Sequence, residues 1–391
     1  MDRVDVAVVG AGIVGIAHAV EAHRRGLSVA VVERGPRAAG ASIRNFGMFW
    51  PIGQPAGRAF ARAMISREVY LDLASKAGFW ADPLGSLHAV YHDDEWACVH
   101  EFVERARPRG FRVEALGPED ARARCPGLNP QGLRGGLWSD TEIAVDPRQV
   151  VARVASWLGT RPGVTVRFSS AATRIEAGAG RPRLHLADGS AIDAERIFVC
   201  GGDDIETLYP EAFRGAPLTR CKLQMLRTGS QPGGWRLGVH LATGSTLRHY
   251  PVFKGLPSLD ALSRRFSREH PEFDRWGIHV MASQMQGGEL TIGDSHEYGP
   301  SPEPFNREAI DDLILGYLRG VLHAPDPRIA ERWYGVYLKR TDGHLEFIHE
   351  PAPGVRLITG LGGNGMTLSF GLAREHFESL GRGEAWVHTP V

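Results

Sequence analysis

The sequence predicts an α/β fold in which a parallel sheet is interrupted by an inserted, mostly antiparallel α+β domain. Three observations lead to this prediction. The first residues read as a buried strand that runs directly into a glycine-rich turn. Residues 218–333 alternate strand patterns with two amphipathic helices. The C-terminal sequence VRLITGLGGNGMTLSFGLAREHFESL reads as a strand, a second glycine-rich turn and a helix that returns to the first domain.

Three glycines follow the strand Val4 to Val9 at the spacing GxGxxG. At this spacing Gly10 permits a tight turn, Gly12 lets the backbone approach a pyrophosphate, and Gly15 lets the next helix pack close to the strand. The free amides at the start of that helix then face the phosphates. Because glycine-rich turns also occur in ordinary βαβ units, the motif needs its context to predict a Rossmann-type dinucleotide site.

The segment after the glycines supplies that context. A helix is predicted over residues 13–25, Gly26 ends it, and a second apolar strand over residues 28–32 leads to Glu33. Glu33 stands about twenty residues after the glycines, where an acidic side chain accepts a hydrogen bond from a ribose 2′-hydroxyl and repels a 2′-phosphate. The sequence therefore predicts a bound dinucleotide with a free 2′-hydroxyl.

The composition is that of a globular protein with a large core. Of the 391 residues 43% are hydrophobic, and 45 basic residues balance 45 acidic ones. This balance argues against a protein drawn to nucleic acid or anionic lipid by its overall charge. No apolar run reaches the length of about 18 residues that a membrane span needs. Because the first strand begins at residue 4, we expect no signal peptide and predict a cytoplasmic protein.

The cysteines predict neither a disulfide framework nor a metal site. They are far apart and form no CxxC or Cys/His ligand spacing. We expect Cys98, Cys125, Cys200 and Cys221 to be buried apolar side chains.

The remaining elements follow in chain order. A Gly/Pro-rich loop over residues 34–57 is too long for a simple connector and is expected to cover a ligand. Asp146 precedes Pro147 as a helix N-cap. Helices are predicted over residues 58–77, from 93 onward, and over 147–158, 259–268 and 307–322, with strands over 85–92, 164–168, 172–176, 183–186 and 196–200. We assign residues 1–80, 146–217 and 334–391 to the nucleotide domain, and residues 81–145 and 218–333 to the inserted domain.

Four segments carry a family resemblance: ERG at residues 33–35, GASIRNFGM at 40–48, IFVCGGD at 197–203 and TGLGGNGMT at 359–367. With them the chain resembles, over nearly its whole length, the D-amino-acid oxidase superfamily of FAD-dependent amine oxidoreductases, which includes glycine and sarcosine oxidases. The resemblance implies a glutathione-reductase-like FAD-binding domain with an inserted substrate domain. The residues expected to contact FAD are Gly10, Gly12, Ile13, Val14, Gly15, Glu33, Arg34, Ser42, Asn45, Phe46, Gly47, Met48, Ala172, Gly201, Gly202, Gly360, Gly362, Gly363, Asn364, Gly365, Met366 and Thr367.

The chain departs from this family at two positions that concern the substrate. Relatives that oxidise α-amino acids carry the pattern G-x-R-P-x-T-P-D, whose arginine holds the carboxylate as a bidentate pair. Here the segment is GVYLKRTD, so Tyr337 stands at the position of the arginine. Glycine oxidase has a second arginine in its C-terminal loop, where this chain has Gly363. A simple amino-carboxylate substrate is therefore not expected.

The segments CKLQMLRT, IHVMASQ, GDSHEYG and RNFGM resemble a branch associated with phosphonate breakdown, which oxidises aminoethylphosphonates. A phosphonate is tetrahedral and more highly charged than a carboxylate, so several donors would replace one planar arginine fork. Each candidate donor has a structural alternative as a solvated surface charge or a satisfied core side chain. The candidates are Arg44, Lys222, Gln224, Tyr250, His279, His296, Tyr337 and Lys339, with His249 and Tyr298 beside them in the sequence.

We therefore predict an FAD-dependent enzyme acting on N-methyl-2-aminoethylphosphonate or 2-aminoethylphosphonate. Hydride passes from the carbon bearing the amine to flavin N5, and water hydrolyses the resulting imine to phosphonoacetaldehyde and an amine. No side chain is assigned as an acid or a base. The alternatives are an oxidase of glycine, sarcosine or another secondary or cyclic amino acid, and a non-enzymatic flavin-binding module. Sarcosine-oxidase relatives attach the flavin through a cysteine near the C-terminal flavin loop, so the resemblance implies non-covalent FAD here, where no cysteine follows Cys221. The electron acceptor and the oligomeric state stay open.

Overall fold

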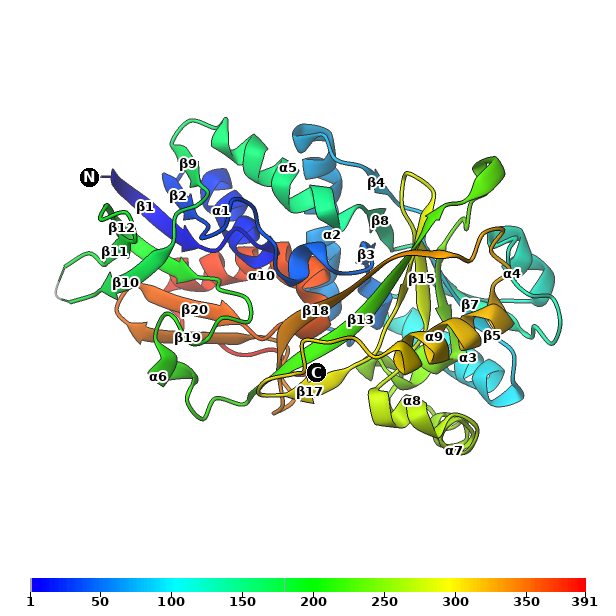
Figure 1. The fold of residues 1–391 in the computed structure, drawn as a ribbon. Helices are drawn as coiled ribbons and strands as arrows, with labels where there is room; N and C mark the ends of the chain where they lie inside the picture. Colours follow the sequence, from blue (N-terminus) through cyan, green and yellow to red (C-terminus); the bar gives the residue numbers. More distant parts are fainter. Residues whose placement is uncertain (1, 179) are drawn as a thin grey trace.

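A computed structural model describes residues 2–178 and 180–391, and its strands form three sheets. Figure 1 shows an elongated molecule with the first sheet, which contains β1 and β20, at one end. The second sheet, which contains β5, β7 and β15, lies toward the other end. The long strands β13 and β18 run through the middle and reach from one region to the other. The predicted combination of a nucleotide-type sheet and an inserted sheet is confirmed.

The first sheet has the strand order β10-β11-β12-β1-β2-β9, and in addition β20 pairs with β12 and β19 pairs with β20. Its central strands are parallel: β1 lies between β12 and β2, and β20 pairs with the second half of β12. Strands from the start, the middle and the end of the chain therefore lie side by side. Their bounds are β1 Asp2–Val9, β2 Val29–Val32, β9 Val164–Arg167, β10 Ala172–Glu176, β11 Arg183–Leu186, β12 Ala191–Val199, β19 Phe347–Ala352 and β20 Val355–Thr359.

Helices that pack on one another accompany this sheet. α10 contacts both α1 and α2, and α5 contacts the same two helices. Their apolar faces form one core in which Ile16 and Leu368 are fully buried, each worth roughly 1.5–3 kcal/mol on burial. The predicted cap of α5 is confirmed, because the Asp146 side chain accepts a hydrogen bond from the Arg148 amide. The bounds are α1 Ile13–Arg24, α2 Arg58–Ala77, α5 Pro147–Gly159 and α10 Gly365–Arg382, with a short α6 at Pro210–Phe213.

The second sheet has the order β17-β13-β16-β15-β14-β5-β7-β6, and β18 pairs with β13 along nearly its whole length. The sheet is mixed, because β14 pairs with β5 in parallel whereas the other strand pairs are antiparallel. The strands are β5 Ser86–Val90, β6 Val113–Leu116, β7 Gly135–Ser139, β13 Leu218–Ser230, β14 His240–Thr243, β15 Met281–Gln284, β16 Glu289–Gly293, β17 Glu297–Gly299 and β18 Ile329–Arg340. The helices are α3 Asp93–Ala106, α4 Pro118–Arg124, α7 Leu259–Glu269, α8 Pro271–Trp276 and α9 Glu308–Val321.

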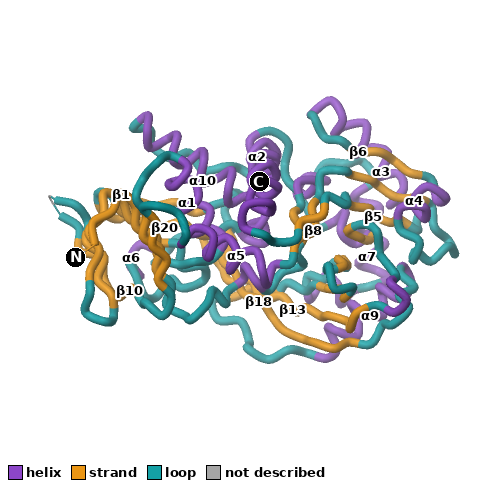
Figure 2. Tube along the Cα trace, turned by 90° about the horizontal axis from the view of Figure 1, so that it is seen from above, coloured by secondary structure: helices purple, strands orange, loops and turns teal. Residues whose placement is uncertain are grey.

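A small third sheet joins the two regions. It consists of β3 (Met48–Phe49), β8 (Ile143–Val145) and β4 (Ala81–Asp82), so the long loop over residues 34–57 contributes a strand of its own. In the view from above, α5 and the region of β8 lie between the sheet of β1 and the elements around β5 (Figure 2). Since this sheet spans the predicted boundary at residue 80, the domain division stays a prediction. Within the described residues, no helix is both long and apolar enough to cross a membrane.

Candidate active site

The first glycine-rich turn connects β1 to α1. The surroundings of its three glycines differ. Gly10 has a φ of +97°, and a Cβ there would lie 2.4 Å from the Cys200 carbonyl oxygen. A Cβ on Gly15 would lie 1.9 Å from the Gly10 carbonyl oxygen, so the fold itself excludes a side chain. A Cβ on Gly12 would meet only the Ser42 hydroxyl, at 3.3 Å. Gly12 is the N-cap residue of α1 and offers no side chain to the helix amides; the Ile13 amide donates to Ser42 Oγ, and the amides after it face the position of a phosphate.

Glu33 is fixed beside this turn. Its carboxylate accepts hydrogen bonds from the Ala11 amide at 2.9 Å and the Gly35 amide at 3.0 Å. The Ser170 amide donates to the Glu33 carbonyl at 2.8 Å, which brings the start of β10, at Ala172, close to this point. The Arg34 side chain is exposed and forms an ion pair with Asp204 at 2.8 Å. Glu33 and Ala172, which are predicted to contact the ribose and the adenine, therefore lie on one side of the turn. The Arg34 guanidinium pairs with Asp204 instead.

The segment from Ser42 to Met48 is ordered by its own hydrogen bonds. Ser42 Oγ accepts from the Ile13 amide at 2.9 Å, which ties the segment to the start of α1. The Asn45 side chain donates to the Ser42 carbonyl and accepts from the Gly47 amide. Gly47 has a φ of +71° and passes so close to β8 that a Cβ would lie 2.1 Å from the Val145 carbonyl oxygen. The segment thus links the nucleotide turn to the inserted domain, with the Phe46 and Met48 side chains packed against the core of that domain.

The second glycine-rich turn, residues 360–367, lies against the first. A Cβ on Gly365 would be 3.6 Å from Ile13 Cγ2, so α10 and α1 begin next to each other. Thr367 Oγ1 accepts from the Trp50 amide at 2.9 Å, and Asn364 Oδ1 accepts from the Gln54 side chain at 2.9 Å. The predicted site residues Gly201 and Gly202 follow β12, and the Gly202 carbonyl accepts from Thr359 at 2.7 Å. The Met366 side chain, in contrast, is buried in the core, where its sulfur accepts from Tyr70.

Tyr337 and Gly363, the two positions that depart from the amino-acid oxidases, lie next to each other. A Cβ on Gly363 would be 3.4 Å from Tyr337 Oη. Two residues further along β18, Lys339 forms a β-bridge with Leu361. The end of β18 therefore runs beside the second glycine-rich turn, and its side chains belong to the same site.

The register of β13 separates two groups of predicted residues. Cys221 stands opposite Tyr337 on β18 and opposite Tyr298 on β17, so these three side chains form one row across three strands. Because successive side chains alternate between faces, Lys222 and Gln224 point to the other face. The Gln224 side chain donates to Asp311 of α9 at 2.7 Å, and Lys222 donates to the Phe305 carbonyl and lies 3.4 Å from Glu297.

This geometry corrects part of the predicted substrate set. Lys222 and Gln224 are buried with protein partners on the face away from Tyr337, so we leave them out of the candidate site. The side chain of Arg44 donates to the Tyr334 carbonyl at 3.3 Å and holds the loop against β18, and it does not join the Tyr337 group. The period-two pattern of β13 was visible in the sequence, but the face turned toward the site was not.

The remaining candidates, Lys339, Tyr298, His296, His279 and Tyr250, contact one another in this order and form one wall of the candidate site. Lys339 Nζ donates to Tyr298 Oη at 3.2 Å, and the Tyr298 ring stacks at 6.2 Å on that of His296. The His296 ring centroid lies 5.2 Å from that of His279, which in turn lies 5.8 Å from Tyr250. Tyr250 packs at 6.1 Å from Trp50, a buried residue that follows β3. Cys221 and Trp50 join this group only through the tertiary structure, whereas Tyr298 is marked in the sequence by its spacing two residues after His296.

Burial governs the charge state of this wall. It lowers the pKa of His296 to about 4, and it lowers the pKa of His249 well below the usual value, with neighbouring histidines adding to the effect. Burial also raises the pKa of Tyr337 well above its usual value and lowers the pKa of Lys339. The rings of His249 and His296 are therefore neutral at pH 7, and Tyr337 keeps its proton and can donate it in a hydrogen bond.

Comparisons with known proteins agree with this architecture. The family profile DAO, described as FAD dependent oxidoreductase, matches residues 5–378. One chain of the anaerobic glycerol-3-phosphate dehydrogenase from Escherichia coli K12 is 30% identical over 151 residues, which is 38% of this chain and 27% of that protein. The chain therefore spans about a quarter of the length of that curated relative.

Solved structures resemble the whole chain at low sequence identity. Glycine oxidase from Geobacillus kaustophilus has a TM-score of 0.76 at 18% identity and covers 99% of this chain and 97% of its own. L-proline dehydrogenase from P. horikoshii has a TM-score of 0.77 at 18% identity, with 98% and 95% covered. At this identity the likeness concerns the fold.

The chain belongs to the DAO family of FAD-dependent oxidoreductases. Its residues fit the cofactor. Gly10 and Gly15 shape a turn that a Cβ would block, Glu33 is held where a ribose would lie, and the start of α10 adds a second amide end close to α1. We retain the predicted FAD contacts as a proposal, except that the Met366 side chain serves the core and the Arg34 guanidinium serves Asp204.

Proposed function

We propose that this protein uses FAD to oxidise a small amine whose anionic group is a phosphonate, with N-methyl-2-aminoethylphosphonate or 2-aminoethylphosphonate as the substrate. The observation that carries the proposal is that Tyr337 lies next to Gly363 in the second glycine-rich turn. In the pattern of the amino-acid oxidases, arginines occupy these positions. The fold likeness to proteins named glycine oxidase and L-proline dehydrogenase supports an amine as the oxidised group.

When bound, FAD supplies the hydride acceptor for the carbon that bears the amine. As the C–H electron pair leaves, the nitrogen lone pair completes a C=N bond. Water then adds to that carbon, and cleavage of the C–N bond gives phosphonoacetaldehyde and the free amine. The step requires an uncharged amine, so an environment poor in water favours it. The buried indole of Trp50 beside Tyr250 provides such an apolar wall.

The anion would be held by donors that differ in direction. Tyr337 and Tyr298 offer hydroxyls from β18 and β17, the two strands that flank this part of β13, and Lys339 supplies a positive charge hydrogen-bonded to Tyr298. Three such donors suit a tetrahedral anion better than the planar fork of one arginine. The relative named glycerol-3-phosphate dehydrogenase, which matches 38% of this chain, has a name that indicates a substrate with a tetrahedral anion, and the proposal agrees with that shape.

The alternative within the same class is an oxidase of glycine, sarcosine or another secondary or cyclic amino acid. The fold agrees with it equally well, since the similar structures include proteins named for both glycine and proline. Lys339 would then be the cation nearest the carboxylate. A panel of substrates separates the two hypotheses.

The test is anaerobic bleaching of the flavin and steady-state turnover with aminoethylphosphonates, glycine, sarcosine and proline. Tyr337→Phe and Lys339→Ala each remove one donor, which costs roughly 1–3 kcal/mol and lowers kcat/KM for the phosphonate about five- to a hundredfold. Lys76→Ala, at an exposed lysine paired with Asp72, is the matched control and should behave as wild type. Wild-type kcat/KM for sarcosine or glycine equal to or above that for the aminophosphonate would refute the proposed substrate.

A further inference from the structure

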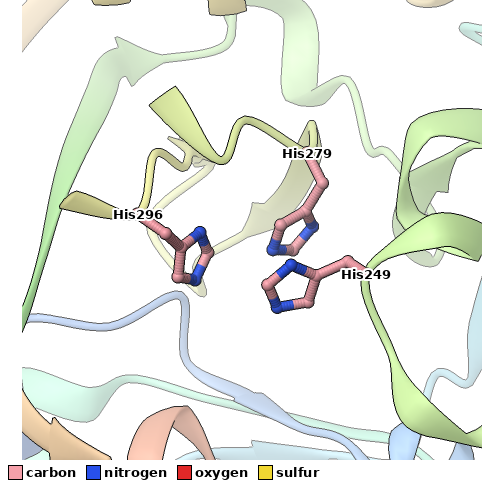
Figure 3. A group of neighbouring side chains, drawn as sticks. All are labelled: His249, His279 and His296. Carbon is pink, nitrogen blue, oxygen red and sulfur yellow. The ribbon is translucent and has the colours of Figure 1, made fainter. Parts of the chain in front are cut away.

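Three histidines from separate segments meet in the wall of the candidate active site. His249 follows the turn Gly244–Arg248, His279 precedes β15, and His296 lies between β16 and β17. One nitrogen from each ring lies within 4.8 Å of a nitrogen from each of the others. Figure 3 shows the three rings close together, each projecting from a different segment of the chain. Such a cluster of imidazoles is a set of nitrogen ligands.

Two of the rings lie beside the kind of group that orients metal-binding histidines. His296 Nδ1 lies 2.9 Å from the Gly277 carbonyl oxygen, which leaves its Nε2 available. His279 Nε2 lies 3.0 Å from Asp294 Oδ1, close enough for a charge contact but without the alignment of a hydrogen bond. A metal-bound histidine almost always engages a carbonyl or carboxylate in this way, because the second contact fixes the ring.

The cluster also contains polar atoms whose hydrogen-bonding capacity is unused. His279 is 3% exposed and Asp294 5% exposed, yet His279 Nδ1 and Asp294 Oδ1 have no aligned hydrogen-bond partner among the described residues. Buried polar atoms without a partner are rare, and each one calls for an ion or another group in the functional protein. Here the unused atoms are a nitrogen of one of the three rings and an oxygen of the carboxylate beside it.

We propose that His249, His279 and His296 bind one divalent transition-metal ion, with Asp294 and the Gly277 carbonyl as orienting groups. Three imidazoles select zinc, iron, copper or nickel and disfavour magnesium or calcium, which prefer oxygen ligands. A tetrahedral site with bonds of about 2.1 Å needs nitrogens about 3.4 Å apart, so the rings must draw together. His249 is half-buried, and its ring contacts those of His279, His296 and Tyr250 with no side-chain hydrogen bond to hold it among the described residues, so it can turn toward the ion.

A three-histidine ion keeps one coordination position open. That position would accept an oxygen of the substrate anion, a consequence that rests on the proposed function. Metal binding itself does not rest on it. The sequence predicted no metal because these histidines are far apart in the chain and follow no ligand spacing.

Binding of Zn²⁺ alone tests the proposal. The FAD-loaded enzyme is treated with a chelator, freed of it, and titrated with Zn²⁺ by calorimetry, and bound zinc is counted by mass spectrometry after gel filtration. We expect about one ion per chain. His249→Ala and His279→Gln should weaken binding at least about tenfold, and Asp294→Asn about ten- to a hundredfold. The exposed His323 lies outside the cluster, so His323→Ala should bind zinc as the wild type does.

Flavin absorbance and the melting temperature of each variant show whether it has folded. His249 is half-buried, so its alanine variant provides the test even if a substitution at His279 prevents folding. Wild-type protein that binds no Zn²⁺ at micromolar concentrations, or a folded His249→Ala variant that binds it as tightly as wild type, would overturn the proposal. These measurements use no substrate, so their failure leaves the phosphonate hypothesis untouched, and oxidation of sarcosine leaves the metal site untouched.

Discussion

Gly12 precedes α1 and Gly15 lies in its first turn. Replacing each of them by alanine separates the effect on folding from the effect on cofactor binding. In Gly15→Ala the new methyl would lie 1.9 Å from the Gly10 carbonyl oxygen, which is backbone and cannot move without opening the turn. In Gly12→Ala the methyl meets only the Ser42 hydroxyl at 3.3 Å. Gly12 has a φ of −68°, a value that alanine adopts readily. The same added atom should therefore damage the fold at one position and the FAD site at the other.

The expected magnitudes follow from these contacts. Overpacking at Gly15 costs about 1–3 kcal/mol or more, because the helix must move away from the turn. Alanine in place of glycine at the cap position of α1 costs at most about 1 kcal/mol. A cofactor present at a thousandfold excess over its Kd adds about 4 kcal/mol of stability. We expect the methyl of Gly12→Ala to remove most of this gain, since it occupies the space through which the pyrophosphate would pass.

Thermal unfolding of each variant, with and without added FAD, measures both effects. The Gly15→Ala apoprotein should unfold about 1–4 °C below the wild-type apoprotein, because the melting temperature of a chain of 391 residues shifts by about 1.2 °C per kcal/mol. The Gly12→Ala apoprotein should unfold close to wild type, but FAD should no longer raise its melting temperature. Full flavin content in desalted Gly12→Ala, or a Gly15→Ala apoprotein as stable as wild type, would refute this reading of the motif.

Other predictions concern stability and cofactor attachment. Burial lowers the pKa of His18 to about 4 whereas the unfolded chain titrates near 6.5, so its contribution is complete above pH 6.5 and is lost as the pH falls toward 4. Between pH 7.5 and 5 the wild type should lose about 2 kcal/mol more than His18→Gln in urea unfolding, and equal losses would contradict the assignment. Arg62→Met leaves the buried carboxylate of Glu346 unpaired and should cost about 3–5 kcal/mol in chemical unfolding. The exposed pair of Arg382 serves as control, and Arg382→Met should change the same free energy by at most about 1 kcal/mol. Acid precipitation should release yellow flavin into the supernatant because no cysteine follows Cys221, and colour retained in the pellet would reveal a covalent link.

The parts of the fold that the sequence predicted are those governed by local contacts. The helix over residues 58–77 and the helix from Pro147 have the predicted starts, because a proline, a cap and an apolar stripe act within a few residues. β12 was predicted over residues 196–200 but covers Ala191–Val199. Its first half pairs with β11 in a hairpin, so its strand character depends on a neighbour rather than on its own pattern.

The candidate site shows the same division between local and distant contacts. The glycine spacing and Glu33 located the nucleotide turn, since both lie within one βαβ unit. The choice among the basic and aromatic candidates was not available from the sequence. Lys222 and Tyr337 were both candidates from the sequence, yet the register of β13 against β18 places them on opposite faces.

By itself, the sequence determined the class of fold, the dinucleotide turn and the family, because glycines, caps and apolar periodicity express constraints between residues a few positions apart. Only the tertiary structure decided which side chains meet. The row of Tyr298, Cys221 and Tyr337 and the cluster of His249, His279 and His296 join strands and turns that are far apart in the chain. Such contacts depend on strand register and sheet order, which are fixed by the packing of the whole core and not by the residues on either side.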